Sequence, residues 1–402
     1  MALENGTQLP LRSEIGIYNE THPLRSVMLW GPVGAEAVLA EVHPQNISLF
    51  YDKMQVPKAR KEAHEFTTTL QSKGVDVVLA RDELAHLLPT REGITPGHVQ
   101  DSLISRLHQT NKKYGMPHSS TALAGYEDDL VDLFHQDIER YGEEGAVALN
   151  MALSIDPKMP LGNTIYARDQ MNVLLGSRVV SRMKEPIRKP EVALFERVYS
   201  ELFPKHKRIT LPDGETFEGG DAYIHNGHVY IGVGVRTSLN ATAHIYEQLR
   251  PELEESGLRF AIVEDREGRN NQDFMHLDTF SNPIGEQEIA ICMDETNRRF
   301  VSIFATDSAG RTVLEDTRMN YTQYLERTGD TIVSIPLEEQ GNFGCNFLTL
   351  NENEIILPMD DNERTTAALL QHQKTIIPVR LYENTRGYGA AHCMTGQLLR
   401  RR

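Results

Sequence analysis

The sequence has few cysteines and no long hydrophobic run, and each absence excludes a class of protein. Three cysteines in 402 residues are too sparse and too odd a set for a disulfide framework, and they suit a reducing compartment. No apolar run approaches the ~20 residues that span a bilayer, and the N-terminus lacks the basic-then-apolar pattern of a signal peptide. We therefore expect a cytoplasmic protein that is neither secreted by the usual route nor embedded in a membrane.

Basic residues are also in deficit, with 41 lysines and arginines against 57 acidic residues and a formal net charge of -16. Such a field repels phosphate backbones and anionic lipid surfaces, so we expect no nucleic-acid or membrane partner. A cationic ligand would be attracted, although most acidic proteins owe only their solubility to this charge. The chain has no His-x-x-x-His or Cys-x-x-Cys spacing, and we expect neither a metal nor a cofactor.

One layout recurs along the chain: a polar loop, a short apolar strand, a turn, a second strand and then a helical pattern. In its clearest copy, strands at 222–225 and 228–231 flank Asn226-Gly227, the strongest short hairpin signal. At intervals of 55, 58 and 68 residues, the copies start near Asn163, Glu218, His276 and Gly344. Roughly constant spacing indicates one supersecondary unit that is used several times.

An earlier copy comprises a strand at 26–30, a helix at 57–72 and a strand at 76–79. After it, apolar residues recur at helical spacing without strands, which predicts an all-helical insertion over residues 83–157. No Gly/Ser linker or low-complexity tract marks a flexible boundary. We expect residues 1–402 to form one α/β domain that carries this insertion.

Polar stretches fall at the starts of the proposed repeats, where the loops of a pseudo-symmetric fold would meet at one cavity. In the first stretch, Asp169 offers a carboxylate for a cation and Asn163 offers hydrogen bonds, while a plain surface turn is the alternative. In the second, Glu218 and Asp221 enclose a glycine pair. That pair either lets the backbone approach a ligand closely or serves a turn that needs positive φ.

In the third stretch, the period of a strand would place His276 and Asp278 on the same side of the chain. A base and a carboxylate in this arrangement suit one ligand, and an edge-strand pair that faces water is the alternative.

Near the C-terminus, a run of small residues leads to Cys393. A thiol becomes a strong nucleophile when a neighbour stabilises the thiolate, but most lone cysteines are buried and inert. We assign Cys292 and Cys345, within strand-like apolar runs, to that inert group. His392 cannot share a strand face with Cys393, and we interpret it as packing or loop support.

These stretches, in this order and over nearly the whole chain, resemble the arginine deiminase family of the guanidino-group-modifying (pentein) superfamily. The superfamily also contains amidinotransferases and dimethylargininases. The resemblance implies a five-bladed, pseudo-symmetric α/β propeller of ββαβ repeats with an inserted helical subdomain. It also implies a small-molecule guanidino substrate and a homo-oligomer.

By position in the motifs, the resemblance makes Cys393 the nucleophile, His276 the general acid and base, and Glu218 the supporting carboxylate. Asp169 and Asp278 match the pair that grips the guanidinium, a planar cation that two carboxylates orient through bidentate hydrogen bonds. Attack by the thiolate would give a thiouronium intermediate. Water activated by His276 would then hydrolyse it, so that arginine yields citrulline and ammonia.

The expected substrate-binding residues are Asn163, Arg188, Asp221, Arg236 and Tyr388. Arg188 and Arg236 match arginines that bind the α-carboxylate or shape the pocket. Tyr388, however, replaces the second arginine of the family motif Arg-Gly-Arg-Gly-Gly-Gly-His-Cys, and two alanines replace glycines after it. One carboxylate clamp is therefore missing, so a modified arginine or a guanidino compound with another tail is a candidate substrate.

Three alternatives remain open at this level. An amidinotransferase would use the same residues but pass the amidino group to an amine, although Met394-Thr395-Gly396 after the nucleophile resembles the deiminases more closely. A non-catalytic binding protein is disfavoured because every catalytic position is filled. Hydrolysis could also continue past citrulline to ornithine.

Overall fold

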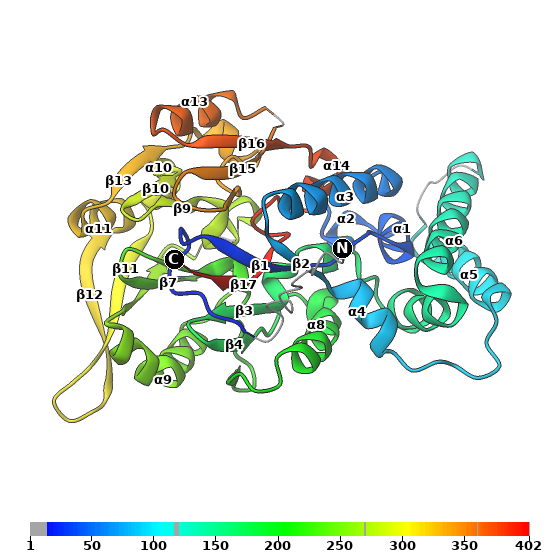
Figure 1. The fold of residues 1–402 in the computed structure, drawn as a ribbon, viewed down its shortest axis with the longest axis horizontal. Helices are drawn as coiled ribbons and strands as arrows, with labels where there is room; N and C mark the ends of the chain where they lie inside the picture. The colour runs from blue at the N-terminus through cyan, green and yellow to red at the C-terminus, as the bar shows by residue number, and fades with distance from the viewer. Residues whose placement is uncertain (1–13, 116–119, 269–270, 360, 402) are drawn as a thin grey trace, which may run out of the picture.

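The computed structural model describes residues 14–115, 120–268, 271–359 and 361–401. Within them, the mixed α/β fold contains five sheets (Figure 1). Four sheets have three strands: β17-β1-β2 (Gly396–Arg400, Leu24–Leu29, Asp76–Leu79), β3-β4-β5 (Met171–Leu174, Ser177–Val180, Arg208–Thr210), β13-β10-β9 (Thr331–Ser334, Glu288–Ile291, Ser281–Gly285) and β14-β15-β16 (Leu348–Thr349, Glu354–Pro358, Thr375–Val379). The remaining sheet is β12-β11-β8-β7-β6 (Thr312–Asn320, Phe300–Thr306, Arg259–Glu264, His228–Val233, Ala222–His225).

All five sheets repeat one strand pattern. Two strands pair antiparallel, and the second of them pairs parallel with a third, as β3, β4 and β5 do. A parallel neighbour requires a crossover, usually a helix. The helices in these crossovers are α3 (Val56–Ser72), α8 (Lys189–Leu202), α9 (Leu239–Ser256), α11 (Tyr321–Thr328) and α13 (Glu363–Gln371). They lie around the outside of the molecule (Figure 1).

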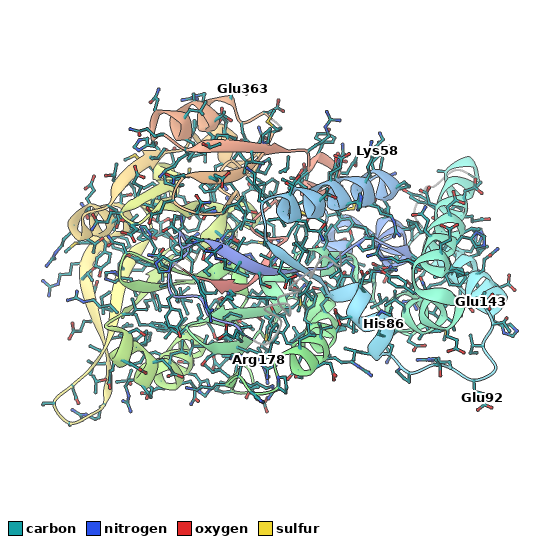
Figure 2. The ribbon with its side chains drawn as sticks, in the orientation of Figure 1. Lys58, His86, Glu92, Glu143, Arg178 and Glu363 are labelled. Atoms are coloured by element: carbon teal, nitrogen blue, oxygen red, sulfur yellow. The ribbon has the colours of Figure 1, made fainter. Side chains whose placement is uncertain are left out.

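The amphipathic sequence of the crossover helices explains this outer position. In α3, Ala59 and Phe66 are buried against the sheet side, while Lys58 points to solvent (Figure 2). In α9, Ile245 and Leu249 pack into one apolar cluster with Ile231 of β7. Each sheet thus buries its apolar face under its own helix.

Two further strands extend the sheet that contains β6 to β8. β11 pairs antiparallel with β8 and with β12, and the two form a long ribbon before α11 (Figure 1). The repeat pattern read from the sequence does not include this ribbon.

The chain between β2 and β3 is helical and projects to one side of the molecule (Figure 1). Its main helices are α4 (Ala80–Leu87), α5 (Pro96–Tyr114) and α6 (Ser120–Asn150), with non-helical angles at Gly142. A buried bidentate ion pair between Arg81 of α4 and Asp137 of α6, at 2.6 and 2.7 Å, holds two of them together. The remaining α-helices are short: α1 (Ala35–Glu41), α2 (Gln45–Ser48), α7 (Ala167–Gln170, directly before β3), α10 (Met293–Thr296), α12 (Leu337–Gln340) and α14 (Tyr382–Thr385). Across the described residues, every helix is too short or too polar to traverse a bilayer.

Several local predictions are confirmed. The strand at 76–79 is β2, and the helix predicted at 57–72 starts one residue earlier, at Val56. The Asn226-Gly227 hairpin joins β6 to β7, with φ of 42° and 73° at the two turn residues. Both values lie in the left-handed region that this tight turn requires.

Two local predictions are wrong. His276 and Asp278 do not share a strand: His276 precedes a 3-10 turn, Leu277–Thr279, and β9 starts only at Ser281. The hydroxyl of Thr279 closes this turn by donating to the carbonyl of His276 at 2.7 Å. Cys292 and Cys345 are buried as expected, but they lie just outside strands, in loops.

Candidate active site

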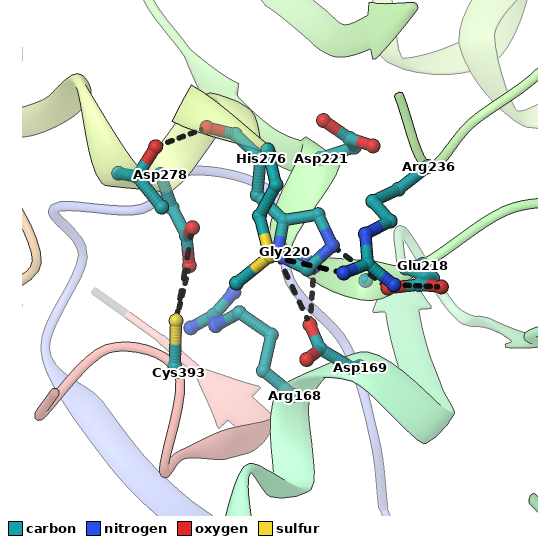
Figure 3. Close-up of polar contacts among 12 residues, drawn as sticks. Arg168, Asp169, Glu218, Gly220, Asp221, Arg236, His276, Asp278 and Cys393 are labelled. Atoms are coloured by element: carbon teal, nitrogen blue, oxygen red, sulfur yellow. Dashed lines mark hydrogen bonds and ion pairs between the residues drawn. The ribbon is translucent and has the colours of Figure 1, made fainter. Parts of the chain in front are cut away.

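The candidate site is built from the loops that lead into the first strand of each sheet. Within three residues of such a strand lie Asp169 (before β3), Asp221 (before β6), Asp278 (before β9), Asn346 (before β14) and Cys393 (before β17). The repeated strand pattern therefore delivers one polar side chain per repeat to the same region, where Figure 3 shows Asp169, Asp221, Asp278 and Cys393 and where Asn346 contacts Cys393.

His276 is fully buried between two carboxylates. Its Nε2 lies 3.0 Å from Oε2 of Glu218, and its Nδ1 lies 3.7 Å from Oδ1 of Asp169 (Figure 3). Burial opposes charging of the ring, but Asp169 and Glu218 outweigh it and raise the pKa of His276 to about 9. The imidazole is therefore protonated at neutral pH.

The glycine pair allows this close packing. A Cβ on Gly220 would lie 2.6 Å from Nδ1 of His276, and a Cβ on Gly219 would lie 2.0 Å from the carbonyl oxygen of Arg168. Neither glycine has positive φ. Of the two interpretations left open by the sequence, close approach of the backbone is the one that the structure supports.

Cys393 has its sulfur 3.6 and 3.8 Å from the two carboxylate oxygens of Asp278 (Figure 3). Burial, followed by the negative charges of Asp278 and Asp169, raises the pKa of the Cys393 thiol well above its ordinary value. A cation placed among these groups would reverse that shift. These surroundings favour the neutral thiol and are complementary to a positively charged ligand.

Asn346 was not identified from the sequence, although it holds Cys393 in place. Its Nδ2 donates to the Cys393 sulfur at 3.2 Å and to the backbone carbonyl of Asp278 at 3.2 Å. Its Oδ1 accepts from the backbone N–H groups of Ala390 and Cys393. A repeat start at Gly344 was visible in the sequence, so the position two residues later could have been found by comparing the repeats.

Two predicted binding residues, Arg188 and Arg236, lie against the carboxylates that flank His276. Arg188 donates from Nη1 to Asp169 Oδ2 at 2.7 Å and from Nε to Glu191 at 3.1 Å. Nη1 of Arg236 lies 3.7 Å from Oε1 of Glu218. Both guanidinium groups are buried and balance the carboxylates around His276.

The other three predicted binding residues have different surroundings. Asn163 donates from its side chain to the Ser48 carbonyl at 2.7 Å. Asp221 accepts from Thr237 at 2.6 Å and from the Leu277 N–H at 3.0 Å, and burial raises its pKa to about 7. These two side chains therefore fix the loops around the site.

Tyr388 lies farther out and is half-buried, with its ring 5.2 Å from that of Tyr51 in an edge-on contact. Its φ of 70° is rare for a residue with a side chain. Nearby, Gly387 and Gly389 pack on the ring of Tyr166 so closely that a Cβ on either would lie 2.4 to 2.5 Å from ring atoms or the hydroxyl. The loop before Cys393 is thus fixed by aromatic packing.

Asp169, Glu218 and His276 each offer a ligand atom, and these atoms lie within 4.8 Å of one another. Two carboxylates and one imidazole are a donor set that can hold a metal ion. The same charges also suit an organic cation, and Arg188 already supplies positive charge to Asp169. The cluster is therefore complementary to positive charge in general.

Comparisons with known proteins show similarity over almost the whole chain. The family model described as arginine deiminase matches residues 48–400. Arginine deiminase from Oenococcus oeni is 24% identical over 423 residues, which cover 97% of this chain and 98% of that protein. Arginine deiminase from Lactococcus lactis subsp. cremoris is 26% identical over 426 residues, which cover 97% of this chain and 99% of that protein.

Solved structures of low identity share the fold. Dimethylarginine dimethylaminohydrolase from Pseudomonas aeruginosa, in complex with citrulline, has a TM-score of 0.54 and 14% identity and covers 93% of this chain and 98% of its own. The N-terminal domain of ArgZ, a cyanobacterial arginine dihydrolase bound to substrate, has a TM-score of 0.56 and 15% identity. This match covers 93% of this chain and 97% of that domain. SxtG, an amidinotransferase from Microseira wollei, has a TM-score of 0.54 and 16% identity. This match covers 96% of this chain and 97% of SxtG. The family match spans most of the sequence and includes the loops that carry Asp169, Glu218, His276 and Cys393, so this chain belongs to the arginine deiminase family.

Proposed function

We propose that this protein hydrolyses the guanidinium group of arginine, or of a close guanidino analogue, to a ureido product and ammonia; with arginine the product is citrulline. The observation that carries the proposal is the convergence of a thiol, a protonated imidazole and three carboxylates in one buried site. A guanidinium needs carboxylates to orient it, a nucleophile to attack its carbon and an acid to protonate the departing nitrogen.

Substrate binding comes first in this mechanism. Asp169 and Asp278 grip the two sides of the guanidinium, and the bound cation lowers the pKa of Cys393 by offsetting the carboxylates that raise it. Cys393 and His276 are almost inaccessible to solvent, so part of the covering chain moves when substrate enters. Arg188 and Arg236 shape the pocket by neutralising Asp169 and Glu218.

Bond making and breaking then follow in two stages. The Cys393 thiolate forms a bond to the guanidinium carbon, the bond from that carbon to one terminal nitrogen breaks, and protonated His276 gives its proton to the nitrogen, which leaves as ammonia. A thiouronium remains on Cys393. Neutral His276 next takes a proton from water, the water oxygen bonds to the carbon, and the carbon–sulfur bond breaks. The proton on the new oxygen passes to the departing Cys393 sulfur, which restores the thiol and leaves the neutral ureido product. Glu218 keeps His276 in position through both stages.

Tyr388 is proposed to select the tail of the substrate. It stands where family members have an arginine, and with Tyr51 it presents aromatic edges rather than a second positive charge. Asn163 and Asp221 act by fixing the loops that hold Asp169 and His276. A substrate with a less anionic tail than arginine would suit this entrance.

The proposal extends to the arrangement of the five sheets and to where and in what form the protein acts. The five sheets with one strand pattern are proposed to be the blades of a pseudo-symmetric propeller formed by the single domain, residues 1–402, with residues 83–157 as its helical insertion. We also propose that the protein acts in the cytoplasm and as a homo-oligomer.

The direct test is incubation of purified, metal-free protein with L-arginine, following citrulline, ornithine and ammonia, with and without glycine as amine acceptor. Equal amounts of citrulline and ammonia, absent with Cys393→Ser, are expected. Ornithine accompanied by a new guanidino compound, formed only when glycine is present, would instead establish the amidinotransferase alternative. No turnover of arginine, together with turnover of a decarboxylated analogue, would assign the difference to the tail of the substrate, where Tyr388 is proposed to act.

A further inference from the structure

His392, which directly precedes the nucleophile, is fully buried between two carboxylates. Its Nδ1 lies 2.7 Å from Oδ2 of Asp278, and its Nε2 lies 3.0 Å from Oε1 of Glu20. An ionised carboxylate can only accept hydrogen bonds. Both contacts are satisfied together only when both ring nitrogens carry a proton, which makes the ring an imidazolium.

The surroundings place the proton on the ring rather than on either acid. Burial alone would favour neutral Glu20, but Arg400 and the hydrogen bond from His392, followed by Arg168, hold the pKa of Glu20 well below its usual range. Burial is likewise outweighed at Asp278, where the hydrogen bond and charge of His392 lower the pKa. Both carboxylates are therefore ionised.

The groups that face His392 come from four different segments. Asp278 belongs to the 3-10 turn before β9, and Glu20 belongs to the segment before β1. Arg168 of α7 donates from Nε to the His392 carbonyl at 3.0 Å, and its Nη2 lies 3.6 Å from Glu20. Arg400 of β17 lies 3.7 Å from Glu20. Two negative and three positive groups thus form a nearly balanced buried network.

We propose, building on the function proposed above, that His392 and Glu20 are positioning residues that keep Asp278 ionised and aimed at the guanidinium. The imidazolium fixes one carboxylate oxygen of Asp278, while Glu20 fixes the imidazolium from behind. Asp278 then retains its negative charge beside Cys393 whether or not a cationic substrate is bound. A packing role for His392 would need neither the second carboxylate nor the second proton.

Two substitutions of His392 distinguish the contribution of Nδ1 from that of Nε2. The amide of His392→Asn can replace the Nδ1 donor to Asp278, whereas the amide of His392→Gln reaches toward Glu20 and leaves Asp278 without its donor. Since a hydrogen bond to a charged group accounts for about a tenfold to hundredfold effect, we expect kcat/KM to fall about 10-fold in His392→Asn and about 100-fold in His392→Gln. The loss should appear mainly in KM for the guanidinium.

The pH profile distinguishes positioning from packing. Without the imidazolium the pKa of Asp278 rises, so the acidic limb of the kcat/KM profile should move to higher pH in His392→Asn, His392→Gln and Glu20→Gln. The matched control is His225→Asn, which removes another fully buried histidine, 2.7 Å from Asp330, outside the site. It should lower thermal stability and leave the profile unchanged.

A measurement on the unsubstituted protein covers the case in which the variants fold poorly. In ¹⁵N NMR of histidine-labelled protein, the His392 ring, assigned by its loss in His392→Asn, should show two protonated nitrogens at pH 7. This result does not depend on turnover, so it remains informative if arginine is not the substrate. A neutral ring, or equal losses in the two His392 variants with unchanged KM and pH profile, would overturn the proposal.

Discussion

Cys393 and Cys345 are both fully buried, and both thiols have pKa values raised well above the ordinary value, yet only Cys393 has the surroundings of a nucleophile. Cys345 packs in an apolar cluster with Cys292 and Phe347. Cys393 lies beside a donor, Asn346, and beside the carboxylate of Asp278. Burial alone therefore makes a thiol inert, and the difference lies in polar groups that allow a bound cation to lower the pKa.

Removal of the Cys393 sulfur should have the largest effect on activity. Cys393→Ser should lower kcat by at least about 10⁴-fold, because a hydroxyl cannot replace the thiolate at this pH and removal of a nucleophile has effects of this order. Citrulline formation measured at saturating arginine checks the loss. Thermal unfolding close to that of the parent serves as the control, and residual activity above one per cent would contradict the assignment.

The donor from Asn346 gives the next largest effect. In Asn346→Ala the Cys393 sulfur loses a hydrogen bond, so kcat/KM should fall about 10- to 100-fold and the thiol pKa should rise further. The pH dependence of alkylation by iodoacetamide, in a background with Cys292 and Cys345 replaced by alanine, reports that pKa.

Asn282→Ala is the matched control for this substitution. Asn282 is also fully buried, and its Nδ2 donates to the carbonyls of Cys345 and Phe347, on either side of Asn346, without touching Cys393. It should reduce stability but leave the alkylation pKa unchanged. Equal pKa shifts in both variants would show that Asn346 acts only by anchoring the loop.

His276 has no counterpart near Cys345, and its charge should be visible in stability. Its pKa rises from 6.5 in the unfolded chain to about 9 in the folded protein, so its stabilisation is complete below pH 6.5 and is lost as pH rises through 9. The stability difference between the parent and His276→Asn should therefore shrink by about 3 kcal/mol over this range. Urea unfolding at pH 6 and pH 9.5 measures it, and a constant difference would mean that folding does not shift the pKa of His276.

The smallest effect is expected at Cys345 itself. Cys345→Ala removes a buried sulfur from an apolar cluster and should cost about 1–2 kcal/mol of stability. Its kcat/KM should match that of the parent. A loss of activity larger than twofold in folded protein would mean that the two thiols are not as distinct as their surroundings indicate.

Much of the fold follows from local sequence. The Asn226-Gly227 turn and the amphipathic helix ending at Ser72 were predictable because each depends on residues close in the chain. The ribbon of β11 and β12 was not, because it depends on pairing with β8 more than thirty residues away. The turn after His276 was also misread, because the backbone is fixed by a tertiary hydrogen bond from the Leu277 N–H to Asp221 and a local one from the Thr279 hydroxyl to the His276 carbonyl, although the sequence alternates like a strand.

The site shows the same division. Cys393, His276, Glu218, Asp169 and Asp278 could be proposed from motif order, and their positions at the starts of the repeats explain why they meet. The contact of His392 with Glu20 joins residues 372 apart in the chain, so no local pattern reveals it. Arg188, which was expected to bind the substrate carboxylate or to shape the pocket, lies on Asp169, because buried carboxylates need a compensating charge.

The central claim is that the guanidinium carbon becomes covalently attached to Cys393. To detect this bond, the protein is quenched with acid during turnover of arginine that is labelled at the guanidinium carbon. Its tryptic peptides are then analysed by mass spectrometry. The labelled adduct is predicted on the peptide from Gly387 to Arg400, which contains Cys393, and on neither of the peptides that contain Cys292 and Cys345. Label on another cysteine, or turnover without any labelled peptide, would contradict it.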